Sequence, residues 1–386
     1  MFKQYRLKNY NFRLVLWVLA LSILGILLVG SAEPSYMNKQ FFGVLLGFTL
    51  MVIISMIDFS WILNFQWVIY ALMLVLLLMV LVRGSSSHGA TRWVSIFGIQ
   101  FQPVEPVKVM LTMFFSRFFM DHESSLNSPK TFFQSLLLAF FPLVLVFSQP
   151  DLKNTLTLLV LFAILYYIAG ISYKIIALIV LVVALLGGGL TAYILNTSTK
   201  PFFLRDYQWE RVETFRDSGD SESDSDNTQQ INSVTAIGSG ELTGKGLNND
   251  DPQSANNGNF IPEIENDFIF AVIGEELGFI GGAGIIMLLF LVVFECIQTG
   301  NRSKDLSGKL ICCGIASVIG IQSFINIGVA TMILPNTGTP LPFISYGLSS
   351  LVSCYIGIGF VLNVGLQSRI RISDVRSRAD GRSSAA

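Results

Sequence analysis

Long apolar blocks alternate with short polar connections along most of this 386-residue chain. A helix that crosses a bilayer needs about 20 mostly apolar residues. The pattern predicts spanning helices at residues 11–31, 40–57, 61–82, 103–120, 132–148, 154–171, 174–195, 267–296, 309–332 and 346–366. The two-residue alternation of a membrane β-barrel is missing from the sequence. The predicted fold is therefore an all-α polytopic membrane protein with a single domain over residues 1–386.

Basic residues orient this predicted bundle, because short cytoplasmic loops are rich in Lys and Arg. They lie before the first span, between the eighth and ninth spans, and after the tenth: Lys3, Arg6, Lys8, Arg13, Arg302, Lys304, Lys309, Arg369, Arg371, Arg376, Arg378 and Arg382. The loop 333–345 carries no basic residue. We therefore expect both termini in the cytoplasm, with residues 367–386 as a cytoplasmic tail. Residues 196–266 then form a long loop on the outer side, between the seventh and eighth helices.

Three stretches of this outer loop differ in character. The acidic run "RDSGDSESDSDNTQQ" (216–230) has few apolar residues and is predicted to be mobile. The stretch "YQWERVETF" (207–215) is amphipathic and suits the membrane surface. The glycine-rich "AIGSGELTGKG" (236–246) lacks the Ser or Thr that follows the lysine of a phosphate-binding loop. We predict that this last stretch serves loop geometry.

Composition excludes several classes of function. Charged residues make up 13% of the chain, against about 25% in soluble domains, and the net charge of −1 predicts no nucleic-acid partner. The four cysteines lie in apolar segments and are expected to be buried thiols. His88 and His122 fall on opposite sides of the predicted membrane, which argues against a Ser-His-Asp triad. The first apolar block has no cleavage site after it, so we expect a retained helix.

The stretch "FIPEIENDF" (260–268) places acids at the outer entrance of the eighth span. Pro262 marks a helix entry, and Asn266-Asp267 is typical of a helix cap. The helix dipole there favours an ionised carboxylate at Asp267. Such a group suits a general base, or a ligand for a divalent cation such as Mg²⁺ or Mn²⁺. Capping and surface solubility are the alternative, and the sequence leaves both open.

The stretch "QFQPVEPVKV" (100–109) places Glu105 and Lys108 on one helix face at the entrance of the fourth span. Charged residues inside a membrane segment point to function, although a structural ion pair is the alternative. Arg92 and Trp93 in the preceding loop add a cation and an interfacial aromatic residue. Glu275 and Glu276 lie about two turns beyond Asp267 and are predicted to be buried and hydrogen-bonded within the bundle, or protonated.

Five stretches in this order resemble the SEDS family, which includes RodA, FtsW and SpoVE. They are "GATRWVSIFGIQFQPVEPVKV", "QPDL", "AIGSGELTGKG", "FIPEIENDFIFAVIGEELGFIGG" and "NIGVATMILPNTGTPLPFISYG". Each is weak by itself, but the set is specific and covers nearly the whole chain. The short N-terminus and the lack of a long C-terminal tail are most similar to RodA.

The resemblance implies a peptidoglycan glycosyltransferase that polymerises lipid II at the outer face of the bacterial cytoplasmic membrane. It implies a role in cell elongation and shape, with a class B penicillin-binding protein and other elongation- or division-complex membrane proteins as partners. The essential aspartate of the family falls on Asp267, and its conserved Trp, Glu and Lys fall on Trp93, Glu105 and Lys108. On this basis Asp267 is the expected base, and Lys108, Arg92 or Arg211 stabilises the diphosphate. No cofactor is certain, and a divalent cation at Asp267 stays open.

The chain departs from the family pattern at four places, namely Val104, Glu265-Asn266, Lys153 and Leu348. Lys153 stands where "QPDL" is usually followed by Gly. Glu265 adds an anion close to Asp267, which tends to raise the pKa of that carboxyl. Two other functions are compatible with the same charges: a flippase for lipid II and a non-catalytic scaffold for the transpeptidase.

Overall fold

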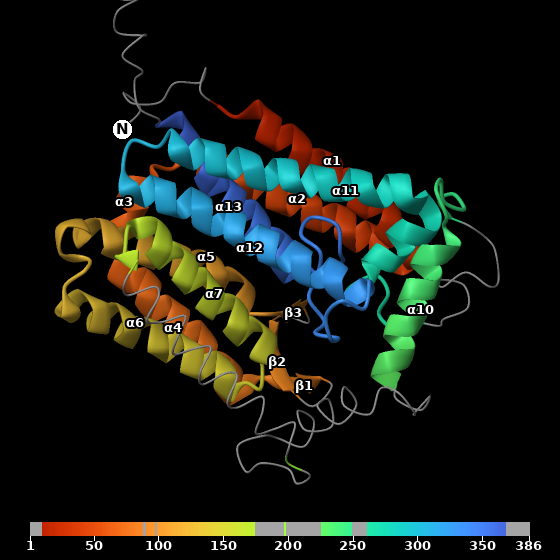
Figure 1. Ribbon diagram of the computed structural model, residues 1–386, viewed down its shortest axis with the longest axis horizontal. Coiled ribbons are helices and arrows are strands. Elements are labelled where there is room, and N and C mark those ends of the chain that lie inside the picture. The colour runs from red at the N-terminus through yellow and green to blue at the C-terminus, as the bar shows by residue number, and fades with distance from the viewer. Residues whose placement is uncertain are drawn as a thin grey trace, which may run out of the picture.

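The computed structural model describes residues 10–87, 90–96, 99–173, 225–248 and 261–367, together with residue 197. These residues form a bundle of long helices with a small antiparallel sheet at one end (Figure 1). The helices are α1 (Phe12–Ala32), α2 (Pro34–Met56), α3 (Phe59–Leu63), α4 (Gln66–Arg83), α5 (Val104–Asp121), the short 3-10 helix η3 (Glu123–Ser125), α6 (Pro129–Ser148), α7 (Leu152–Ala169), α10 (Ser225–Ser239), α11 (Ile269–Asn301), α12 (Leu306–Ala330) and α13 (Leu348–Leu366). The strands are β1 (Ser85–Ser87), β2 (Ala90–Ile96) and β3 (Ile99–Phe101), in the order β1-β2-β3.

Seven helices among the described residues are long and apolar enough to cross a membrane, and Gln66–Val82 adds a shorter apolar helix. Nine of the ten predicted spans coincide with helices. The remaining span, 174–195, lies outside the described residues. The observed helices differ from the predicted spans in some details. The second helix begins at Pro34, six residues early, because proline suits a first helical turn and Glu33 accepts a hydrogen bond from the Ser35 amide. The third span is divided into α3 and α4.

Two apolar clusters hold the bundle together. The larger joins α1, α2, α11, α12 and α13, and the smaller joins α4, α5, α6 and α7. Figure 1 shows them as two neighbouring groups of helices, and α12 joins them by packing against both α5 and α7. Large apolar side chains are also exposed along α2, α4, α6 and α11. Burial inside and apolar surface outside together indicate a multi-pass membrane protein, whose outer surface faces lipid.

The sheet and α10 were not predicted. In the sheet, β2 and β3 form a hairpin in which Val94 is opposite Phe101. Helix α10 includes the last residues of the acidic run 216–230, so the prediction of mobility was wrong for residues 225–230. Polar side chains on α10 bond to the end of α12: Gln230 donates to the carbonyl of Val329 at 2.9 Å, and Ser233 to that of Ala330 at 2.8 Å. Residues 207–215 and 368–386 lie outside the described residues.

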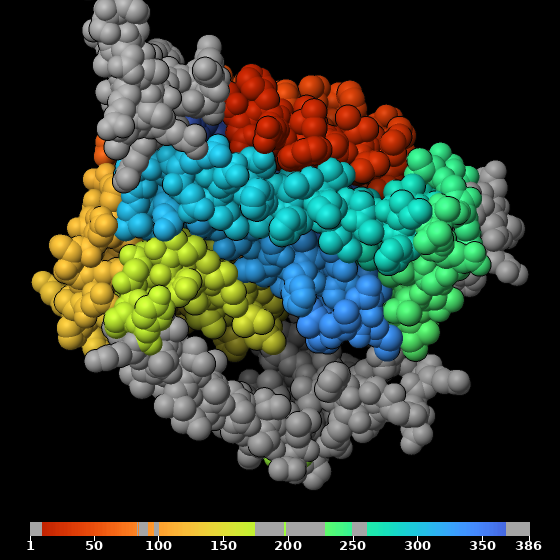
Figure 2. Space-filling model, turned by 45° about the horizontal axis from the view of Figure 1, so that its top comes forward, coloured from red at the N-terminus to blue at the C-terminus, as the bar shows by residue number. Residues whose placement is uncertain are grey.

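Helix α11 is interrupted at Gly278, where the backbone has a positive φ of 64° and a ψ of −166°. The glycine-rich segment 240–246 bonds to the backbone on both sides of this break. The Lys245 amide donates to the Glu275 carbonyl at 2.9 Å, and the Phe279 amide donates to the Glu241 carbonyl at 2.9 Å. The segment therefore replaces helical hydrogen bonds that the break removes. Figure 2 shows α10 and this segment packed against the end of α11.

Candidate functional site

Asp267 lies two residues before the first residue of α11, at the end of the bundle where α5 and α7 also begin. Its side chain is partly exposed. The cap prediction was wrong, because Phe268 is the N-cap residue and the helix has no side-chain cap hydrogen bond. The positive end of the α11 dipole nevertheless lies next to Asp267 and attracts negative charge.

A buried amide fixes the backbone of Asp267. Asn326, on α12, is fully buried, and its Nδ2 donates to the carbonyl of Asp267 at 2.9 Å and to that of Thr339 at 2.7 Å. A second link joins the same two segments, because the Tyr346 amide donates to the Glu265 carbonyl at 2.9 Å. These hydrogen bonds therefore hold the irregular loop 331–347 against the turn that carries Asp267. The prolines at 335, 340 and 342 lie in this non-helical stretch between α12 and α13.

Gly338, in this loop, lies against the carboxylate of Asp267. Its φ of +62° is in the left-handed region, which glycine adopts most readily. A Cβ atom at position 338 would lie 2.5 Å from Oδ2 of Asp267 and 3.5 Å from Nζ of Lys153. A glycine is therefore required for the loop to approach these two charged groups, which come from α7 and from the entrance of α11.

A buried ion pair lies next to this mouth. Nζ of Lys108 donates to Oε1 of Glu105 at 2.7 Å, and Nε2 of Gln322 donates to Oε2 of the same carboxylate at 3.2 Å. Lys108 is 1% exposed and Glu105 4%. The structural ion pair, which the sequence left open as the alternative, is therefore present. Removing two charges from water is costly, and their attraction with a further hydrogen bond offsets that cost.

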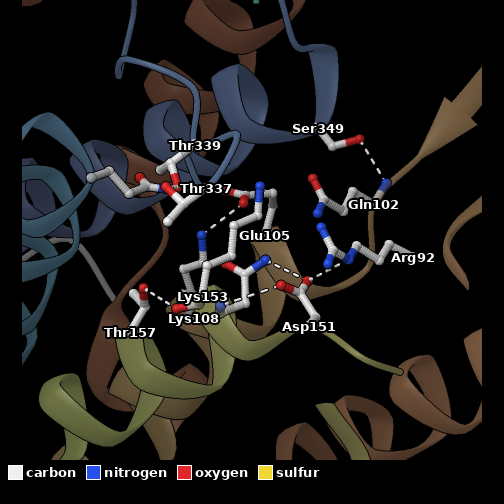
Figure 3. Close-up of polar contacts among 12 residues, drawn as sticks. Arg92, Gln102, Glu105, Lys108, Asp151, Lys153, Thr157, Thr337, Thr339 and Ser349 are labelled. Atoms are coloured by element: carbon white, nitrogen blue, oxygen red, sulfur yellow. Dashed lines mark hydrogen bonds and ion pairs between the residues drawn. The ribbon is translucent and has the colours of Figure 1, made fainter. Parts of the chain in front are cut away.

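Arg92 and Asp151 connect the sheet to α7. Nη2 of Arg92 donates to the carbonyl of Pro150 at 2.8 Å, and Nε lies 3.9 Å from Oδ2 of Asp151. Asp151 is the N-cap of α7 and accepts hydrogen bonds from the amide and Nδ2 of Asn154. Figure 3 shows Arg92, Asp151, Lys153, Lys108 and Glu105 close together between α5 and α7. Trp93 is partly exposed on β2, and Arg211 lies outside the described residues.

The comparisons with known proteins identify the family. A family model described as "Cell cycle protein", FTSW_RODA_SPOVE, matches residues 8–370. The chain belongs to this family. It is 30% identical to the peptidoglycan glycosyltransferase MrdB of Escherichia coli K12, over 91% of this chain and 92% of that protein. It is 34% identical to a probable peptidoglycan glycosyltransferase FtsW of Haemophilus influenzae, over 81% of this chain and 76% of the relative.

Solved structures share the fold. A protein from a peptidoglycan synthase complex, described as coordinating polymerization and crosslinking, superposes with a TM-score of 0.75 and 27% identity, covering 92% of this chain and 97% of that one. RodA of Thermus thermophilus superposes with a TM-score of 0.67 at 24% identity, covering 94% and 98%. The predicted family and the predicted helical membrane fold are therefore confirmed.

Acidic neighbours shape the electrostatics around Asp267. Burial is the largest cause of a raised pKa at Glu265, and the negative charges of Glu263, Glu33 and Asp267 act in the same direction. The described residues contain no group of three or more His, Cys, Asp or Glu side chains arranged to hold a metal ion.

The other buried acids have structural partners. Glu275 accepts a hydrogen bond from Nζ of Lys245 at 2.8 Å, and Glu276 accepts one from the Ser31 hydroxyl. Both are at most 5% exposed, which confirms that they are buried and hydrogen-bonded. The four cysteines are free and buried, as predicted.

Sequence reasoning did not single out Asn326 or Gly338, and it noted Lys153 merely as a departure from the family pattern. The segment "NTGTP" (336–340) already carried a signal, since a glycine between polar residues and prolines marks a constrained turn. What the sequence could not show is which side chain this turn faces.

Proposed function

We propose that this chain is a peptidoglycan glycosyltransferase that polymerises lipid II at the outer face of the bacterial cytoplasmic membrane. The observation that carries the proposal is the position of Asp267. A partly exposed carboxylate lies at one mouth of a membrane bundle, and Asn326 and the loop 331–347 hold it in place. The names of the relatives, which describe peptidoglycan glycosyltransferases, support this activity.

The distribution of basic residues supports the orientation. Asn11 donates to Glu295 at 2.9 Å, so the start of α1 lies beside the far end of α11, away from Asp267. Cationic side chains gather at that far end: Arg13, Arg302, Lys304 and Lys309. Because cationic loops favour the cytoplasm, Asp267 faces outward and both termini are cytoplasmic in this proposal.

In the proposed reaction, the C4 hydroxyl of an acceptor sugar attacks the anomeric carbon of a lipid-linked donor. The new glycosidic bond forms as the bond from that carbon to the diphosphate oxygen breaks, and the configuration inverts. Asp267 accepts the hydroxyl proton, and the lipid diphosphate leaves with the bonding electrons. A positioned base contributes about 10²–10⁴-fold to such a step.

The diphosphate gains negative charge as it leaves, so nearby cations lower the barrier. Arg92 lies at the rim and Lys108 acts from beneath it as part of the buried pair with Glu105. A class B penicillin-binding protein that cross-links the peptides is the proposed partner. The comparison with a synthase complex that coordinates polymerization and crosslinking supports this pairing.

The decisive experiment measures glycan-chain synthesis from lipid II by the purified protein with its transpeptidase. We expect Asp267→Asn and Asp267→Ala to lower the rate at least about 100-fold while the melting temperature changes little. Asp121→Asn is the matched control, because Asp121 pairs with Arg117 at the other end of α5. Polymerisation by Asp267→Ala within about twofold of wild type would exclude the base assignment. Movement of labelled lipid II across vesicles without polymer would instead favour a flippase.

A further inference from the structure

Lys153 is a cation at the mouth of the candidate site. It lies in the first turn of α7, is partly exposed, and places Nζ within 3.5 Å of the point where Gly338 would carry a Cβ. Among the described residues, no hydrogen bond or ion pair holds this ammonium group. The carboxylate oxygen Oδ2 of Asp267 lies 2.5 Å from the same Cβ position.

We propose that Lys153 binds a phosphate oxygen of the lipid diphosphate, beside the base at Asp267. This inference rests on the proposed function and assigns the donor side of that site. The leaving diphosphate lies against the α7 entrance, and the attacking hydroxyl lies against the α11 entrance. As the bond from the anomeric carbon to the diphosphate oxygen breaks, the ammonium of Lys153 stabilises the charge that builds on the leaving group.

Two other acids near Lys153 already have partners. Asp151 accepts from Asn154 and lies near Arg92. Glu105 accepts from Lys108 and from Gln322. The charge of Lys153 is thus left available for an incoming anion. Lys108, which is 1% exposed and bonded to Glu105, cannot reach a ligand at the surface without breaking a buried pair.

The position of Lys153 is also unfavourable for the helix itself. Cations are stabilising near the C-terminal end of a helix and unfavourable in the first turn, where the dipole is positive. An anion bound at this turn makes the local electrostatic energy favourable, because the anion interacts with both the lysine and the positive end of the helix dipole. The local cost of Lys153 is therefore offset when a phosphate group is bound.

The test measures binding of undecaprenyl diphosphate to the full chain in nanodiscs. One charge-assisted hydrogen bond corresponds to about tenfold or more in affinity. We expect Lys153→Met and Lys153→Gln to weaken binding at least about tenfold, and Lys153→Arg to stay within about threefold. Lys130→Met, at an exposed lysine in the first turn of α6, is the control and should bind as wild type. Wild-type affinity in folded Lys153→Met and Lys153→Gln would overturn the proposal.

Asp267→Asn separates this inference from the proposed function. It removes an anion beside Lys153, so it should bind undecaprenyl diphosphate at least as tightly as wild type while losing polymerisation. Full polymerisation by Asp267→Asn would refute the assigned base. The Lys153 proposal would then be decided by the binding measurements alone. Wild-type binding by the Lys153 variants, with polymerisation lost in Asp267→Asn, would refute the diphosphate site alone.

Discussion

Gly338 lies so close to Asp267 that a Cβ at this position would be 2.5 Å from the carboxylate oxygen Oδ2. The backbone at Gly338 is also in the left-handed region, with φ of +62°. We predict that Gly338→Ala displaces Asp267 and lowers polymerisation at least about tenfold, since small misplacements of a catalytic group cost up to about 10²-fold. The rate of glycan synthesis from lipid II by the purified variant checks this.

Gly170 is the matched control for this substitution. It also has a positive φ, of +100°, but among the described residues no atom other than those of its chain neighbours lies within 4 Å of where its Cβ would be. Gly170→Ala introduces the backbone strain without the steric contact, costing about 1 kcal/mol. We expect it to keep near-wild-type polymerisation. Equal losses in the two variants would show that strain, and not contact with Asp267, is responsible.

Asn326 links the backbone of Asp267 to that of Thr339. Asn326→Asp preserves the shape of the side chain but removes the donor, so two carbonyls then face a carboxyl group. We predict a loss of stability of about 1–3 kcal/mol or more, together with a loss of polymerisation per folded molecule. Thermal unfolding and polymerisation assays on the same preparation measure both effects.

Asn363 offers a comparison at the far end of the bundle, where its Nδ2 donates to the Ser55 carbonyl at 2.8 Å. Asn363→Asp should destabilise the protein by a similar amount while folded molecules keep their activity. If Asn326→Asp also kept its activity per folded molecule, Asn326 would have no role in positioning Asp267.

Glu265 makes the stability of the folded protein depend on pH. Burial first, and then the charges of Glu263, Glu33 and Asp267, raise its pKa in the folded protein. The folded state therefore holds this proton more tightly than the unfolded chain, whose Glu pKa is about 4.3. The penalty for ionising Glu265 is absent below that value and grows as the pH rises through the raised folded pKa.

We predict that Glu265→Gln removes this penalty. Its melting temperature should exceed that of wild type at neutral pH, and the difference should shrink as the pH falls towards the ordinary glutamate pKa. Melting curves at a series of pH values measure the effect. A difference between the two proteins that is the same at every pH would contradict the assignment to Glu265.

Because Glu105 and Lys108 form a buried pair, the effects of substituting them on stability should be strongly non-additive. Lys108→Met alone leaves a buried carboxylate without its cation, which costs about 3–5 kcal/mol. Glu105→Gln combined with Lys108→Met should recover most of that stability. If the double variant folds but does not polymerise, the pair also acts electrostatically in the reaction. Full polymerisation by the double variant would leave it a purely structural role.

Much of this architecture could be predicted because membrane spans are encoded locally. About twenty apolar residues specify a spanning helix, and the i,i+3 spacing of Glu105 and Lys108 specifies their contact. The helix α10 could not be predicted in the same way. Gln230 and Ser233 look solvated in the sequence, but their partners are carbonyls about 100 residues away.

The same limit applies to the candidate site. Asp267 was identified through its motif, whereas its neighbours Gly338, Asn326 and Lys153 come from three separate segments. Each of these residues taken alone is ordinary in its own segment. Their relationship arises from the packing of α12, α7 and the loop 331–347, which no local pattern encodes. A local sequence motif can therefore identify Asp267 without showing which residues from other segments contact it and fix its position.

The break at Gly278 divides α11 into two mechanically distinct lengths. The shorter length, which follows directly from Asp267, is anchored sideways to the segment 240–246 as well as lengthwise to the remainder of the span. The same segment also bonds to Phe279 and Ile280 beyond the break, so a displacement of α10 would act on both lengths of α11 and would reach Asp267 through the shorter one.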